Sequence, residues 1–166
     1  MFKKLFGKKE EVPSTVTVHS PITGTLVQLD EVPDPVFSQK MMGDGMAIKP
    51  DEGVVVSPVD GEIIQLFPTK HAIGIRAKNG AEILIHIGLE TVGMNGEGFT
   101  AHISEGTKVR VGDKLVEFDI PLVEEKASST ITPIIITNGD SISSINKQSV
   151  GKVQAGQSPI MEITAK

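Results

Sequence analysis

The sequence contains no cysteine among its 166 residues. This absence excludes disulfide bridges, thiolate metal ligands and cysteine nucleophiles, and it is compatible with a reducing compartment. No apolar run approaches the roughly 20 residues that a membrane-spanning helix needs. The first residues, MFKKLFGKKEE, also lack the roughly 7–15 apolar residues of a secretory signal. We therefore expect a cytoplasmic protein.

A basic stripe is missing as well, and the net charge is −5 at pH 7. Nucleic-acid binding requires clustered Lys and Arg to meet the phosphates, so we expect no nucleic-acid partner. With 39% hydrophobic and 22% charged residues, the composition is that of a globular protein. The length suits a single domain with one hydrophobic core. We expect this domain to be a monomer.

Residues 1–14 differ in composition from the rest of the chain. Four lysines and two phenylalanines are followed by Glu10, Glu11 and Pro13. We interpret residues 1–14 as a flexible tail and residues 15–166 as the folded domain. A short helix would place the apolar residues of the tail on one face, which allows a weak contact of residues 1–9 with an anionic membrane surface. A solvated tail is the competing interpretation, because so short a helix is unstable alone.

From Val16 onward, short runs rich in Val, Ile and Thr are interrupted by Gly, Pro, Asn or Asp. This pattern is typical of antiparallel sheets. We predict an all-β fold, either an antiparallel β-sandwich or a barrel-sandwich hybrid. Helices should be very short, around residues 35–42 and 122–126, because proline, glycine or serine bounds both segments.

One motif occurs twice. The segment SPITGTLVQL at residues 20–29 is repeated 37 positions later as SPVDGEIIQL at residues 57–66. A weaker similarity links residues 109–113 with residues 153–157, and an apolar run follows each. Such repeats predict paired hairpin units that close a compact, duplicated β structure.

Two of the four histidines can be placed relative to each other. Residues 72–77 and 82–87 flank Asn79-Gly80, and Asn-Gly is the strongest short hairpin signal. A two-residue turn would set His86 opposite Ile73 and His71 opposite Gly88, with both histidines on one face and open space at Gly88. His86 would then point away from the core that Ile83, Ile85 and Ile87 face. His19 and His102 have no such support, and we interpret them as incidental.

A pair of imidazoles suits several chemistries. In phosphoryl transfer, one neutral imidazole attacks phosphorus while the second donates to the phosphoryl oxygens. Thr69 would lie on the strand face of His71 and orient its ring, although turn formation explains this threonine equally well. As zinc ligands, the two histidines would need a third ligand, which no HxH or HExxH motif supplies. A lysine-linked cofactor carrier is the third alternative, with Lys78 at the hairpin tip but without the expected flanking residues.

Several motifs resemble the glucose-type enzyme IIA proteins of the bacterial phosphoenolpyruvate-dependent sugar phosphotransferase system, and the resemblance runs from Val16 to Ile163. The motifs are VPDPVF (32–37), GDGMAIKP (43–50), SPVDGEI (57–63), FPTKHAIGI (67–75), EILIHIGLETVGMNGEGF (82–99), GTKVRVGD (106–113) and STITPIIITN (129–138). The resemblance implies a phosphotransferase that carries a phosphoryl group between proteins in sugar uptake.

It also implies specific roles for residues. His86 would be the phosphorylated histidine, His71 the residue that stabilises the phosphoryl group, and Thr69 the hydrogen-bond partner of His71. The implied partners are the phosphocarrier HPr as donor and a IIB domain of a sugar permease as acceptor. No cofactor is implied, and any zinc at His71 and His86 would be adventitious. The implied partner-binding residues are Asp34, Val36, Phe37, Met41, Met42, Phe67, Glu90 and Val92.

Overall fold

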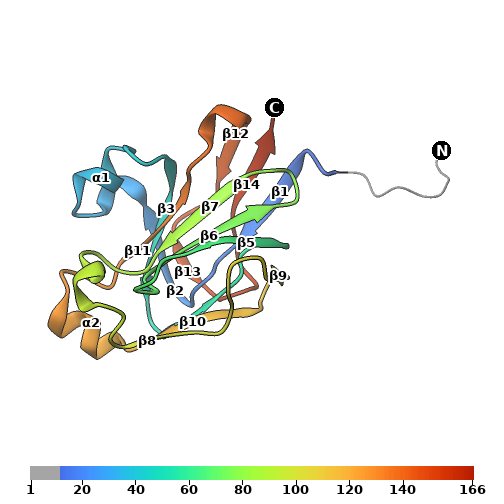
Figure 1. Ribbon diagram of the computed structural model, residues 1–166. Helices are drawn as coiled ribbons and strands as arrows, with labels where there is room; N and C mark the ends of the chain where they lie inside the picture. The colour runs from blue at the N-terminus through green and yellow to red at the C-terminus, as the bar shows by residue number, and fades with distance from the viewer. Residues whose placement is uncertain (1–11) are drawn as a thin grey trace, which may run out of the picture.

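The computed structural model describes residues 12–166, which form fourteen strands in three antiparallel sheets (Figure 1). The eight-stranded sheet has the order β13 (Gly151–Val153), β2 (Gly24–Gln28), β3 (Asp44–Pro50), β11 (Thr132–Ile136), β7 (Glu82–His86), β6 (Ala72–Ala77), β5 (Gly61–Leu66) and β9 (Lys108–Val109). One three-stranded sheet contains β1 (Thr15–His19), β14 (Pro159–Ala165) and β12 (Ile142–Lys147), and the other contains β4 (Val54–Val56), β10 (Lys114–Phe118) and β8 (Phe99–Ala101). The predicted all-β class is confirmed.

The duplicated motif forms the same structure twice. Each copy of the Ser-Pro motif follows a strand of a small sheet, β1 or β4, and leads into a strand of the large sheet, β2 or β5. Strands β2 and β5 pair with β13 and β9, each of which ends at the first residue of one copy of the weaker repeat. The side chains of Thr23 and Asp60 accept hydrogen bonds at corresponding places, from Ala155 N and Val111 N. The predicted duplication therefore determines the framework of the fold.

Two apolar clusters lie on opposite faces of strand β7. Ile83, Ile85 and Ile87 belong to the main core, which fills the space between the sheets. Leu84 belongs to a second, smaller cluster on the other face. His86 follows the alternation and lies on the face of Leu84, as predicted. That face is partly covered rather than open, because Phe37 and its neighbours pack over it.

The predicted register of the β6–β7 hairpin is wrong by one residue. His86 pairs with Ala72, not Ile73, and Ala77 N donates to Ala81 O across a three-residue loop. Within this loop, Gly80 has a positive φ (90°) but Asn79 does not, whereas the predicted two-residue turn needs a positive φ at both residues. The Asn79 amide instead donates to Ser14 O and Ile163 O, which attaches the hairpin tip to β1 and β14.

Both helices are short and begin at an aspartate that accepts a backbone hydrogen bond. Asp34 accepts from Val36 N at the start of α1 (Pro35–Ser38), and Asp119 accepts from Leu122 N at the start of α2 (Ile120–Lys126). A proline in the first turn favours helix initiation in each case. Both helices lie on the left of the molecule in Figure 1, where β6 begins and β7 ends.

The predicted tail falls largely outside the described residues, which begin at Val12. Ser14, assigned to the tail, is already attached to the domain, since its carbonyl accepts from Ala165 N as well as from Asn79. The proposed membrane contact of residues 1–9 lies outside the described residues. Among residues 12–166, no helix has the length and apolar character required to cross a membrane.

Candidate functional site

His71 and His86 lie side by side. Their ring centroids are 5.0 Å apart and the ring planes meet at 80°, an edge-to-face arrangement. His71 precedes β6 and follows a turn in which Lys70 has a positive φ of 64°, so strand alternation does not dictate its direction. This turn brings His71 to His86 although the predicted cross-strand pairing is wrong. The prediction that the two imidazoles are neighbours is therefore confirmed for a different reason.

The tautomer of His86 is fixed by the backbone. Nδ1 lies 2.8 Å from the carbonyl oxygen of Gly88. A carbonyl oxygen can only accept, so Nδ1 carries the proton and the Nε2 lone pair of the neutral ring remains free. The side chain of His86 is partly exposed. The arrangement provides a nucleophilic nitrogen that an incoming group can reach.

Gly88 serves this site in a way that the sequence analysis misjudged. Its predicted open space is absent, because a Cβ there would lie 2.7 Å from Thr91 Cγ2 and 2.8 Å from Ser129 O. Its φ of +74° is also a conformation that favours glycine. Gly88 is thus required for the sharp turn that aims its carbonyl at His86. No sequence signal marks this role, since every residue has a carbonyl.

His71 is held by a side chain. Thr69 Oγ1 lies 2.6 Å from His71 Nδ1, which confirms the predicted contact. Phe67 packs its ring against that of His71, with centroids 5.4 Å apart. Only 3% of His71 is exposed, so this histidine is buried rather than open to a partner. Its ring is held in one orientation by the threonine, the phenylalanine and His86.

Both histidines are disposed to be neutral at pH 7. Burial, together with the nearby charge of His86, lowers the pKa of His71 to about 4. Burial also lowers the pKa of His86, although the Gly88 carbonyl and the carboxylate of Asp34 oppose that shift. A neutral imidazole is the form that can act as a nucleophile. The environment therefore maintains the reactive form.

The apolar residues assigned to partner binding differ in exposure. The ring of Phe37, on α1, packs against that of His86 with centroids 5.0 Å apart. Phe37, which was assigned to partner binding, is only 4% exposed and packs beneath the site. Phe67 is partly buried. The other apolar residues assigned to partner binding are exposed: Val36, Met41, Met42 and Val92.

The two acidic residues assigned to partner binding lie in different settings. Asp34 is half-buried, caps α1 and is close enough to His86 to affect its pKa. Glu90 is exposed and adopts a left-handed conformation with φ 61°. Asp34 is therefore part of the surroundings of His86. Glu90 is accessible to a partner.

The described residues offer little support for the zinc alternative. In residues 12–166, no three side chains of His, Asp or Glu are grouped so that they could hold a metal ion. His102 bonds to Glu117 on the neighbouring strand, with Nε2 and Oε1 2.8 Å apart. Within residues 12–166, no third ligand of the kind that a zinc hydrolase requires is therefore grouped with His71 and His86.

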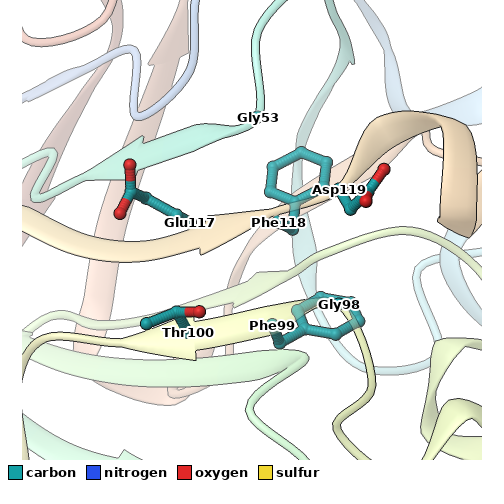
Figure 2. A pocket seen from close by; sticks show the side chains of 7 residues that line it. All are labelled: Gly53, Gly98, Phe99, Thr100, Glu117, Phe118 and Asp119. Atoms are coloured by element: carbon teal, nitrogen blue, oxygen red, sulfur yellow. The ribbon is translucent and has the colours of Figure 1, made fainter.

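A separate depression of about 480 Å³ is lined by residues of the neighbouring strands β8 and β10 and by Gly53 (Figure 2). Its carboxylates are already engaged, Glu117 by His102 and Lys114, and Asp119 by the first turn of α2. The stacked rings of Phe99 and Phe118 are buried. This depression contains no nucleophile comparable to His86, so the histidine pair is the better candidate site.

Known proteins share this sequence and fold. Residues 16–142 match the family described as phosphoenolpyruvate-dependent sugar phosphotransferase system, EIIA 1. A PTS system glucose-specific EIIA component from Bacillus cereus is 61% identical over the whole of both chains. One from Staphylococcus aureus is 50% identical, covering 99% of each chain.

The structural comparison agrees. The glucose permease IIA from Mycoplasma capricolum superimposes with a TM-score of 0.85 at 39% sequence identity, covering 93% of this chain and 99% of its own. The antiparallel β fold, the duplicated motif and the histidine pair are all accounted for by one assignment. The chain belongs to the EIIA family of the phosphoenolpyruvate-dependent sugar phosphotransferase system, and it is a phosphotransferase that carries a phosphoryl group on a histidine.

Proposed function

We propose that His86 is the phosphorylated histidine, which receives its phosphoryl group from phospho-HPr and passes it to the IIB domain of a sugar permease. The observation that carries this assignment is the hydrogen bond from His86 Nδ1 to Gly88 O, which leaves Nε2 free. Nε2 attacks phosphorus, the nitrogen–phosphorus bond of the donor breaks, and its electron pair returns to the donor imidazole. Transfer to the IIB domain repeats the step with His86 as leaving group.

His71 stabilises the transferred group in this proposal. The Thr69 hydroxyl donates to Nδ1, so the neutral ring of His71 carries its proton on Nε2. This N–H then donates a hydrogen bond to a phosphoryl oxygen. The edge-to-face packing of the two rings places such a donor beside the nucleophile. Thr69 is accordingly a positioning residue. Charge on the phosphoryl oxygens is stabilised without a metal ion, and we propose that no cofactor is needed.

The exposed apolar residues around His86 form the docking surface. Val36, Met41, Met42 and Val92 are 38–69% exposed, and methionine side chains adapt to different partners. Asp34 and Glu90 add negative charge for basic side chains of the partners. Because the relatives named above are glucose-specific components, we propose glucose as the transported sugar. The protein acts as a monomer in each docking event.

The experiment is reconstitution with phosphoenolpyruvate, enzyme I and HPr, followed by mass spectrometry at alkaline pH to locate acid-labile phosphate. Wild type should gain one phosphoryl group within the peptide that contains His86. His86→Ala should gain none, whereas His102→Ala, which removes a histidine hydrogen-bonded to Glu117, should match wild type. Equal labelling of wild type and His86→Ala would refute the assignment.

A further inference from the structure

Asp44 joins three parts of the structure at one oxygen. Its Oδ1 accepts from Gly45 N at 2.8 Å and from Lys147 Nζ at 2.7 Å, and it lies 3.6 Å from Lys40 Nζ. Asp44 is the first residue of β3, whereas Lys147 ends β12 in a different sheet. This carboxylate therefore bridges segments 103 residues apart in the sequence.

The interaction differs from an ordinary surface ion pair. The side chains of Asp44 and Lys147 are 32% and 24% exposed, compared with 53% and 76% for the Asp51–Lys152 pair at the other end of β3. Burial raises the pKa of Asp44, but the bonds from Lys147 and Gly45 and the charges of the two lysines outweigh it, and the pKa falls below its usual value. A partly buried, multiply bonded pair restricts the chain more than an exposed one.

The segment under this restraint is the connection of residues 39–43 between α1 and β3. Its backbone hydrogen bonds are local: Lys40 N donates to Phe37 O, Met41 N to Val36 O, and Gly43 N to Lys40 O. Lys40 adopts a left-handed conformation with φ 60°, which costs free energy for a residue with a side chain. Met41 is 69% exposed and belongs to neither apolar cluster, so packing does not fix it.

The Asp44 carboxylate supplies the missing restraint. It contacts Lys40 near the beginning of the connection, and Asp44 itself directly follows Gly43, the last residue of the connection. The bond to Lys147 thereby anchors both ends of the connection to β12. Removing the carboxylate would leave residues 39–43 held only at their ends, by α1 on one side and by the pairing of β3 with β11 on the other. The exposed methionines would then sample more conformations, and each docking event would have to order them again.

We propose that Asp44, anchored by Lys147, is a positioning residue that holds Met41 and Met42 in the conformation required for docking of phosphoryl-transfer partners. The inference rests on the proposed docking role of these methionines. It assigns no chemical step to Asp44, since its carboxylate is committed to the two lysines and to Gly45. The effect should therefore appear in partner affinity and not in the rate of the bound complex.

The test is a steady-state assay of phosphoryl transfer from phospho-HPr with Asp44→Asn, Lys147→Met and the control Lys152→Met. Loss of a charged hydrogen bond should raise the KM for phospho-HPr about fivefold to tenfold in the first two variants. Their kcat should stay within about twofold of wild type. Asp44→Glu should recover most of the affinity, and Lys152→Met should behave as wild type.

An unchanged KM in both Asp44→Asn and Lys147→Met would overturn the inference, as would a fall in kcat alone. An equal rise in KM for Lys152→Met would overturn it too, because a general charge effect would then suffice. Failure of the proposed function is detected separately, by His86→Ala accepting phosphate in the same assay. Thermal unfolding of each variant identifies any loss of folded protein.

Discussion

The carbonyl oxygen of Gly88 accepts a hydrogen bond from Nδ1 of His86, two residues earlier in the chain, at 2.8 Å. Because this acceptor belongs to the backbone, it stays in place when the side chains of the site are altered. The orientation of the nucleophile is therefore expected to survive mutation of its neighbours, including His71. Acceptance and onward transfer of the phosphoryl group can then be separated by mutation.

Replacing His71 by glutamine tests this separation. His71→Gln retains His86 and the Gly88 contact, so it should accept a phosphoryl group from phospho-HPr to the wild-type extent. Transfer to the IIB domain should slow about tenfold to hundredfold, since a donor to the phosphoryl oxygens is lost or misplaced. Rapid-quench measurement of both half-reactions is the assay. Equal slowing of both would contradict the separate roles.

Replacing Thr69 by valine tests how His71 is held. The change keeps the shape of the side chain but removes the hydroxyl that lies 2.6 Å from His71 Nδ1. We expect onward transfer to slow about tenfold and nitrogen NMR to show a mixture of His71 tautomers. Thr69→Ser, which retains the hydroxyl, is the control. A wild-type tautomer in Thr69→Val would show that the threonine does not orient the ring.

The lowered pKa of His71 predicts a specific sensitivity to acid. The pKa is about 4 in the folded chain and 6.5 in the unfolded one, so between these values the unfolded chain binds more protons. The contribution of His71 to the free energy of unfolding is therefore highest above pH 6.5. It falls as the pH decreases toward 4, by on the order of 3 kcal/mol in total. Urea unfolding from pH 7 to pH 4 should show a shallower loss of stability in His71→Gln. Parallel curves for both proteins would contradict the lowered pKa.

Gly88→Ala tests the turn behind the nucleophile. The new Cβ would meet Thr91 and the Ser129 carbonyl in a left-handed backbone, and we expect a loss of about 2–4 kcal/mol in the free energy of unfolding. Gly80→Ala is the matched control, because Gly80 also has a positive φ but no atom within 4 Å. It should lose only about 1 kcal/mol. Urea denaturation measures both, and similar losses would show that crowding at Gly88 is unimportant.

The sequence correctly predicted the fold class and the proximity of the two histidines. It did not predict the hairpin register. Strands with β-branched residues and the repeated Ser-Pro motif leave local signals, so the duplicated framework could be predicted. The hairpin register could not be predicted, because the Asn79 side chain donates to Ser14 O and Ile163 O, and both residues are distant in sequence. Whether Phe37 is buried or available to partners could not be decided from the sequence, since a short helix gives no indication of the face on which it will pack.

The eight-stranded sheet has two equivalent halves, β13-β2-β3-β11 and β9-β5-β6-β7, but the two copies have diverged in their connections. In one copy, the link from β2 to β3 carries α1 and the exposed methionines. In the other, the much shorter link from β5 to β6 carries Thr69 and His71. In the proposed function, the docking methionines and the residues that stabilise the phosphoryl group on His86 therefore lie in corresponding loops of a symmetric scaffold. If the proposed roles hold, variation in the β2–β3 link is expected to alter partner choice without disturbing the β5–β6 link that holds Thr69 and His71.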